Sequence, residues 1–209
     1  MITMVYNKTK QIVAKQQALK DKILKAAREV LAERETADTS IKTIAKKAGI
    51  ATGTFYLYFR NKELLIDTVV EELYTELLAL IKEERAKHTD IFDKLQASMG
   101  VCVSKFMQEK HLAKILLEHF PAAQAVFNTK LTHIERELIR FVKEDLDELL
   151  ARGLIPEQDT QVSAVAFVGT FRQVIFAWLS EGEPDDFSKA YQTLMDYNMR
   201  ALGKWAAPK

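Results

Sequence analysis

Cysteine, proline and glycine are all scarce in this sequence of 209 residues. Cys102 is the only cysteine, which excludes a framework of internal disulfides and a cysteine-rich zinc site. Four prolines and seven glycines leave few positions where a helix must break, and the alternation typical of strands is also rare. The sequence therefore predicts an all-α protein of long helices, about nine in total.

Long apolar runs are missing as well. The most apolar stretch, residues 162–179, is interrupted by Arg172 and Gln173, and no secretory signal is present. The hydrophobic content of 48% nevertheless suffices for a core. We therefore expect a soluble, cytoplasmic protein without a membrane partner.

Catalytic motifs are not found either. His88, His111, His119 and His133 are scattered, and none lies in a nucleophile or metal-binding motif. The carboxylates of residues 144–148 are interpreted as the solvated face of a long helix. No glycine-rich phosphate loop is present. We predict that the protein is no enzyme and has no catalytic residue, cofactor or metal site.

Charge is distributed unevenly along the chain. Residues 1–62 hold 13 Lys and Arg against 5 Asp and Glu, whereas the remainder holds 17 against 24. A basic segment of this kind is typical of proteins that bind nucleic acid. Residues 1–17 lack a strong period, so we expect a frayed arm there, with Lys8, Lys10 and Lys15 as a solvated tail.

Three short helices are predicted after this arm. Apolar residues at helical spacing mark the first over residues 18–34, and Ile41, Ile44, Ala45 and Ala48 mark the second. Gly49 ends the second helix, because glycine readily adopts the left-handed conformation. The third helix covers residues 51–59, with Thr52 suited to cap it. Helix, turn and helix form a helix-turn-helix.

The third helix carries an unusual set of side chains for a packing helix. Hydroxyl groups alternate with Phe55, Leu57 and Phe59, which we expect to anchor the helix. Hydroxyls can bond phosphates and base edges, as a helix in the major groove requires. The predicted DNA contacts on this helix and around it are Ser40, Lys42, Thr43, Thr52, Gly53, Thr54, Tyr56, Tyr58 and Lys62.

The run IAKKAGIATGTFYLYFRNKELL resembles the DNA-binding signature of the tetracycline-repressor (TetR) family of bacterial transcription regulators. The matching features are Ile44-Ala45, Ala48-Gly49, Gly53-Thr54, Tyr56, Tyr58-Phe59 and Lys62-Glu63-Leu64-Leu65. The resemblance implies an N-terminal DNA-binding domain, residues 1–62, and a helical effector-binding and dimerisation domain, residues 63–209. A helix of more than twenty residues from Lys62 onward is predicted to link the two.

The second domain is predicted to contain five further helices after this linking helix, and in the family such a body binds a small molecule. Aromatic and sulfur-containing side chains could surround its apolar cavity, or they could simply fill the core. These candidate pocket residues are Met99, Cys102, Phe106, Met107, Phe120, Phe127 and Phe141.

The helix predicted at 159–180 is apolar on nearly every side and must be covered on all sides. In the family, the last two helices pair with those of a second copy. By this resemblance the dimer interface would contain Phe171, Ile175, Trp178, Tyr191, Leu194 and Asn198. A monomer with this helix at the centre of one bundle is the alternative.

The function implied by the resemblance is ligand-responsive regulation of transcription. A homodimer would bind a palindromic DNA operator as a repressor and leave it when a small hydrophobic effector binds. The alternative is a non-catalytic helical adaptor that binds only proteins. An adaptor explains the amphipathic helices, but it gives no reason for basic charge beside the hydroxyl-rich helix.

Overall fold

The computed structural model describes residues 2–33, 38–111, 113 and 124–205, with side chains from residue 11 onward and without those of residues 124–134. These residues form helices and no strand, which confirms the all-α prediction. The chain divides into two compact units, Met1–Glu72 and Leu73–Lys209. The eight described helices are α1 (Ile2–Glu33), α2 (Ile41–Lys47), α3 (Thr52–Phe55), α4 (Lys62–Arg85), α5 (Ile91–Gln108), α7 (Gln124–Ala151), α8 (Thr160–Glu181) and α9 (Phe187–Ala201).

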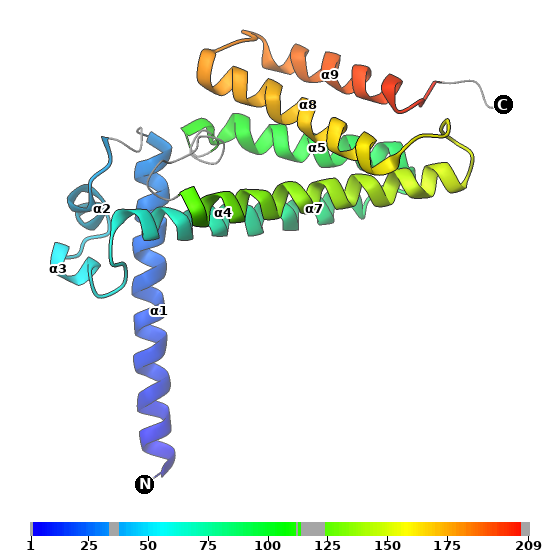
Figure 1. Ribbon diagram of the computed structural model, residues 1–209. Coiled ribbons are helices and arrows are strands. Elements are labelled where there is room, and N and C mark those ends of the chain that lie inside the picture. Colours follow the sequence, from blue (N-terminus) through cyan, green and yellow to red (C-terminus); the bar gives the residue numbers. More distant parts are fainter. Residues whose placement is uncertain (1, 34–37, 112, 114–123, 206–209) are drawn as a thin grey trace. The chain divides into compact units, whose positions relative to one another are not determined.

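The first unit packs α2 and the start of α4 against the second half of α1 (Figure 1). Ile23, Ala27 and Leu31 are completely buried in α1, as the apolar period predicts. Ile44 of α2 and Leu65 of α4 are also completely buried. Shared burial of this kind stabilises helices that are too short to be stable alone.

The N-terminal arm is helical, which corrects the expectation of a frayed segment. α1 begins at Ile2 and continues without a break to Glu33. Residues 11–18 are all exposed. Hydrophobic periodicity reports burial, so it gives no signal for a helix that buries nothing. Lys, Gln and Ala are good helix formers, and they dominate residues 8–18.

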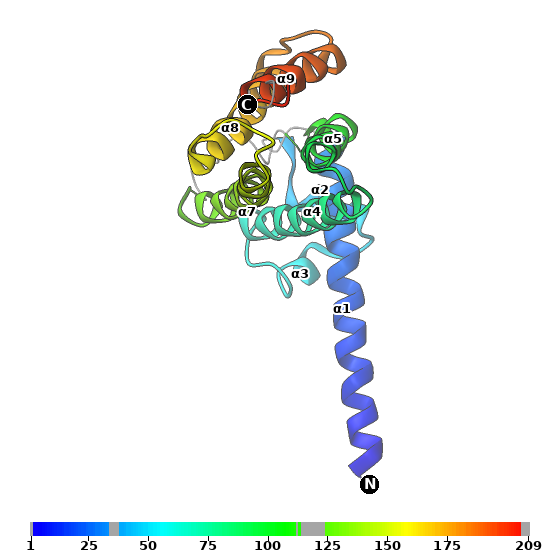
Figure 2. The same ribbon diagram turned by 90° about the vertical axis from the view of Figure 1, so that its right-hand side faces the viewer.

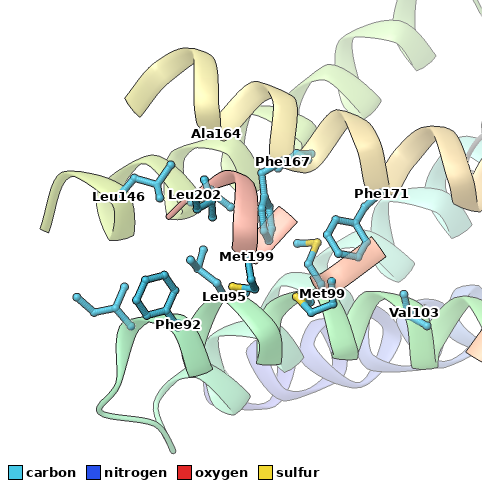
Figure 3. Packing of buried hydrophobic residues seen from close by; sticks show 14 of the residues in the cluster. Phe92, Leu95, Met99, Val103, Leu146, Ala164, Phe167, Phe171, Met199 and Leu202 are labelled. Atoms are coloured by element: carbon cyan, nitrogen blue, oxygen red, sulfur yellow. The ribbon is translucent and has the colours of Figure 1, made fainter. Parts of the chain in front are cut away.

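The core of the second unit lies between α5, α7, α8 and α9. Figure 3 shows Phe92, Leu95, Met99 and Val103 of α5 facing Phe167 and Phe171 of α8, with Met199 of α9 between them. All of these side chains are at most 8% exposed. A continuous core of this size holds the four helices together mainly by removing apolar surface from water.

The ends of the helices in the second unit have clear local causes. Asp90, Asp159 and Asp186 each accept hydrogen bonds from backbone amides at the start of α5, α8 and α9. Gly153, after α7, and Gly182, after α8, adopt φ angles of 65° and 77°. This left-handed conformation suits glycine, so each of the two residues can end its helix.

An ion pair is buried inside the second unit. Arg85, the last residue of α4, donates to both carboxylate oxygens of Asp145 on α7, at 2.7 and 2.8 Å, and to Ser98 Oγ of α5 at 3.0 Å. The Asp145 side chain is only 7% exposed. Its burial raises the pKa of the carboxyl, and the Arg85 guanidinium opposes that rise. The prediction that residues 144–148 form a solvated face is therefore wrong for Asp145.

α8 is the one helix among the described residues that is long and apolar enough to cross a membrane. A core helix of a globular protein meets the same test, and α8 contributes Phe167, Phe171, Ile175 and Trp178 to the core. Its composition is therefore weak support for a membrane span.

Candidate nucleic-acid interface

The first residues of α2 form a cap that includes two predicted phosphate contacts. Ser40 has extended backbone angles, and its Oγ accepts a hydrogen bond from the Thr43 backbone amide at 3.1 Å. The hydroxyls of Ser40 and Thr43 lie 2.9 Å apart. Ser40 and Lys42 are exposed and Thr43 is half-buried. The two hydroxyls therefore stabilise the helix start and also lie at the surface.

The turn after α2 has the geometry predicted for it. Gly49 has a φ angle of 63°, and its amide donates to the carbonyl of Lys46 while Ile50 donates to that of Ala45. α3 then begins, but it is only four residues long and continues as a turn. Ala51 precedes it as the cap position without a side-chain hydrogen bond, so Thr52 is not the cap and is instead the first helical residue.

Two aromatic side chains hold α3 in place. Phe55 and Phe59 are 0% and 2% exposed, and their ring centroids lie 5.8 Å apart. Tyr56 packs edge-on against Phe55, while 54% of its surface remains exposed. Leu57, expected to be an anchor, is 82% exposed. An apolar side chain held at the surface here could meet a thymine methyl group, and sequence reasoning missed it.

The start of α4 is fixed by polar contacts. Asn61 Oδ1 accepts from the Leu64 amide at 2.8 Å, so Asn61 caps the helix. Lys62 Nζ donates to the carbonyl oxygen of Thr39 at 3.1 Å. Lys62 thus stabilises the loop before α2 while its half-buried side chain remains partly at the surface.

All nine predicted DNA contacts lie in the first unit, and none of them is buried. Ser40, Lys42, Thr52, Gly53 and Tyr56 are exposed. Thr43, Thr54, Tyr58 and Lys62 are half-buried. A hydroxyl-rich surface that also carries lysine side chains, anchored from behind by buried phenylalanines, has the chemistry needed to bind DNA phosphates and base edges.

The predicted pocket residues have different environments. Met99 belongs to the main core, whereas Cys102 and Phe141 pack with Leu77 and Ile81 of α4 in a second cluster. Half-buried Phe106 packs against both clusters, and Met107 is 40% exposed. Burial raises the pKa of the Cys102 thiol to about 12. Phe120 and the Phe127 side chain lie outside the described residues.

A groove of about 730 Å³ lies elsewhere in the second unit. It is lined by α5, the end of α4 and Tyr191 of α9, and its described lining includes none of the predicted pocket residues. Its lining includes the charged side chains of Lys87, Lys105, Glu83 and Glu84. Apolar side chains such as Leu80 and Val101 occupy only part of it.

Most of the residues predicted for a dimer interface are buried inside the single protomer. Phe171, Ile175, Trp178 and Asn198 are at most 7% exposed, and Tyr191 and Leu194 are half-buried. Trp178 stacks on Phe187 with ring centroids 4.2 Å apart. These side chains are committed to the core of one chain, so a partner would meet a neighbouring face of the same helices.

That neighbouring face is an apolar strip on α8, which we call the α8 strip: Val162, Val165, Ala166 and Gly169. Val162 and Val165 are 62% and 47% exposed, and Ala166 is also exposed. A Cβ added at Gly169 would meet nothing within 4 Å. The spacing of three and four residues places all four on one side of the helix. Exposed Tyr197 of α9 is a further large side chain of this kind.

Three arginines of α7 and α8 and a histidine after α4 lie at or near the surface. Arg140 pairs with Glu137 and Glu144, and Arg172 lies 3.6 Å from Glu135. Arg136 is exposed. His88 lies 3.8 Å from Glu84. Within the described part of the chain, no group of three or more histidine, cysteine or carboxylate side chains could hold a metal ion.

Comparison with known proteins identifies the first unit. Residues 23–69 match the family model of the bacterial regulatory proteins, tetR family. The matched range contains α2, α3 and every predicted DNA contact. The fatty acid metabolism regulator protein of Bacillus subtilis is 25% identical over 165 residues, which span 78% of this chain and 85% of the relative.

Solved structures share the fold over most of the chain. The fatty acid degradation regulator FadR from Bacillus halodurans has a TM-score of 0.74 at 24% identity, covering 88% of this chain and 96% of its own. FadR from Bacillus subtilis in complex with stearoyl-CoA has a TM-score of 0.73 at 22% identity, covering 88% and 97%. These proteins are transcription regulators and not enzymes. The match over residues 23–69 and the relatives together identify this chain as a DNA-binding transcription regulator whose N-terminal unit is similar to that of the tetR-family proteins.

Proposed function

We propose that this regulator is a repressor that binds a palindromic operator as a homodimer and leaves the DNA when a hydrophobic effector binds. The observation that carries the proposal is the exposed hydroxyl and lysine surface of α2 and α3, within the region that matches the family model. A regulator of this kind acts in the cytoplasm, where the DNA is.

The proposed DNA contacts are of two kinds, those at the major groove and those to phosphates. Thr52, Gly53, Thr54, Tyr56 and Tyr58 would lie at the major groove, because α3 is the element with exposed hydroxyls. The phosphate contacts would be Ser40, Lys42, Thr43 and Lys62, which lie at the starts of α2 and α4. In a homodimer the two α3 helices would enter successive major grooves, with their centres about 34 Å apart.

The α8 strip supports the homodimer. An exposed apolar face on a helix that also contributes to the core is typical of an interface, and a second copy would present the same face. Gly169 leaves open space at the C-terminal end of the strip, where the two helices could approach closely. Half-buried Leu194 and exposed Tyr197 on α9 would complete the contact.

The second unit would bind the effector. The related FadR from Bacillus subtilis binds stearoyl-CoA, and a long acyl chain suits the apolar side chains of Met99, Cys102, Phe106 and Phe141. Leu77 and Ile81 of α4 pack with Cys102 and Phe141. An acyl chain that displaces Leu77 and Ile81 would shift α4. Because α4 begins at the predicted phosphate contact Lys62, this shift would change the spacing of the α3 helices.

DNA binding is tested first with a fragment from upstream of the protein's own gene, over a salt series and with unrelated DNA as competitor. A steep salt dependence and a preference of at least about 10³-fold for the fragment support the proposal. Replacing Tyr56 by Phe should weaken specific binding about fivefold, the value of one hydrogen bond, and leave the melting temperature unchanged. Binding of no DNA would overturn the proposal.

The effector is tested on the protein–DNA complex. Stearoyl-CoA should release the operator and raise the melting temperature of the free protein, whereas coenzyme A without the acyl chain should do neither. Release by both compounds would indicate recognition of the nucleotide part. Release by neither would exclude a long-chain acyl effector.

A further inference from the structure

The groove along α5 is lined by residues of the second unit alone, and we call it the α5 groove. In both views α5 lies between α9 and α4 (Figure 1 and Figure 2). The groove follows one face of α5, where Ala97, Gly100 and Ser104 have small side chains that leave room. Tyr191 of α9 forms a wall, and its hydroxyl donates to the backbone carbonyl of Gln96 at 3.3 Å. The volume of about 730 Å³ is typical of sites that hold small molecules.

α4 and α5 run in opposite directions along this groove. Arg85, the last residue of α4, donates to Ser98 Oγ of α5 at 3.0 Å. Lys105, near the end of α5, lies 2.8 Å from Glu76, which comes earlier on α4. One end of the groove therefore lies where α4 ends and α5 begins, and the other end lies beside Lys105.

The middle of the groove is apolar. Leu80 of α4 and Val101 of α5 come between the two contacts on their helices, and both line the groove together with Ala97. The side chain of Leu80 is 38% exposed. A ligand that covers this apolar surface would remove it from water, which favours binding. A ligand that fits the groove thus needs an apolar body.

Carboxylates outnumber lysines around the groove. The two lysines of the lining each have two carboxylate partners: Lys105 has Glu76 and Glu109, and Lys87 has Glu83 and Glu84. Asp93 adds a fifth carboxylate, so this set has a formal charge of −3 with His88 counted as neutral. The C-terminal end of α4, at the same end of the groove as Asp93, also carries the negative end of the helix dipole. The excess of negative charge favours a cation.

Other lysines of α4 and α5 do not supply the missing positive charge, because each contacts a different part of the second unit. Lys82 lies over the Phe141 ring, Lys110 lies over the Trp178 ring, and the charge of Lys94 acts on Asp145. None of the three belongs to the described lining of the groove.

We propose that the α5 groove is a binding site for an organic cation with an apolar body, such as an alkylammonium ion. The ammonium group lies at the end of the groove that carries Glu83, Glu84 and Asp93, and the apolar body lies along Leu80 and Val101. Because the groove is negative, it does not suit an anionic acyl-CoA, and the site is separate from the apolar core proposed for the effector.

The test uses three probes with the same decyl chain: decyltrimethylammonium, decyl maltoside and decyl sulfate, each below its critical micelle concentration. Isothermal titration calorimetry on the full-length protein at low salt measures their affinities. The cation should bind at least about tenfold more tightly than the neutral and anionic probes, since one ion pair at a protein surface contributes up to about fivefold. Added salt should reduce this preference.

Three variants locate the site. Glu83→Gln/Asp93→Asn should weaken decyltrimethylammonium binding about tenfold and leave decyl maltoside binding unchanged. Glu157→Gln/Asp196→Asn is the matched control, because it removes the same charge from exposed positions outside the described lining, and its affinities should not change. Ala97→Phe fills the apolar middle of the groove and should weaken all three probes. Melting temperatures verify that each variant is folded.

Several results would overturn the inference. These are binding of none of the probes, equal affinity for all three, and tighter binding of decyl sulfate than of the cation. An unchanged affinity for the cation in Glu83→Gln/Asp93→Asn, or an equal loss in the control, would do the same. Unchanged binding in Ala97→Phe would assign the probes to another site. None of these measurements includes DNA, so their failure is distinct from a failure of the operator proposal.

Discussion

Gly53 lies in the first turn of α3, and a Cβ added there would meet no atom within 4 Å. We expect Gly53→Ala to stabilise the free protein by up to about 1 kcal/mol, because alanine is the better helix former. The same methyl group would stand between the helix and DNA if the backbone approaches a base pair closely. Operator affinity should then fall by at least tenfold while the melting temperature rises. Unchanged affinity would remove Gly53 from the DNA contacts.

The Arg85–Asp145 pair shows a buried charge that requires its partner. Arg85→Met leaves the Asp145 carboxylate in the core without its guanidinium, and we expect a loss of about 3–5 kcal/mol in the free energy of unfolding. The double variant Arg85→Met/Asp145→Leu should recover most of that loss, since no charge remains buried. Urea unfolding of the second unit measures both. Additive effects in the double variant would mean that the two side chains act independently.

Residue-level prediction succeeded where a side chain's role is local. Gly49 ends α2 as predicted because its backbone conformation depends on few neighbours. Asp145 was misplaced on a solvated face, because its burial depends on Arg85, sixty residues away. Leu57 was predicted to anchor α3 but is exposed, because α3 ends at Phe55 and the chain then turns outward. No local sequence pattern indicates that Arg85 pairs with Asp145 or that α3 ends at Phe55.

At the scale of elements, the end of α9 docks against the loop between α7 and α8. Gly203 has a φ angle of 88°, and a Cβ there would clash with Pro156 Cδ. Gly203→Ala should therefore destabilise the second unit by more than about 2 kcal/mol, from backbone strain and a clash with a rigid ring. Gly182→Ala is the matched control, with a similar φ of 77° but open space around it. Equal midpoints in urea for the two variants would show that the clash is relieved.

Helix positions were largely predictable, because caps, glycines and apolar periods are local signals. α4 begins at Lys62 as predicted, and α8 agrees with its predicted range, 159–180, to within one residue at each end. α1 was predicted too short because residues 11–18 are all exposed and therefore carry no apolar period. α3 was predicted too long because hydroxyl and aromatic residues continue past Phe55 in a turn.

At the scale of the whole molecule, the proposed homodimer depends on the α8 strip. A lysine at Val165 would place two charges at the centre of a symmetric apolar contact, so Val165→Lys should convert a dimer into a monomer at micromolar concentration. Ser104→Lys adds the same charge at an exposed site on α5 and should leave the mass unchanged. Analytical ultracentrifugation compares the two. A dimer that survives Val165→Lys would show that the strip is not the interface.

The α8 sequence alone could not separate core from surface. Nearly every position of the helix is apolar, so the period that normally marks the buried face is weak. Packing against α7 and α9 decides that Phe171 and Trp178 face inward while Val162 and Val165 remain exposed. The predicted interface named the largest side chains, and large side chains are the ones that a protomer buries first.

The Cys102 thiol can be used to measure local opening of the second unit. The thiol is buried, and with its pKa raised to about 12 it has almost no thiolate at pH 8. A thiol reagent can therefore react only when the second unit opens locally, and no other cysteine adds background. The rate at which the reagent modifies Cys102 therefore reports the equilibrium between the closed and the locally open form. A compound that binds beside Cys102 should slow this reaction, so the absorbance assay can also screen for effectors.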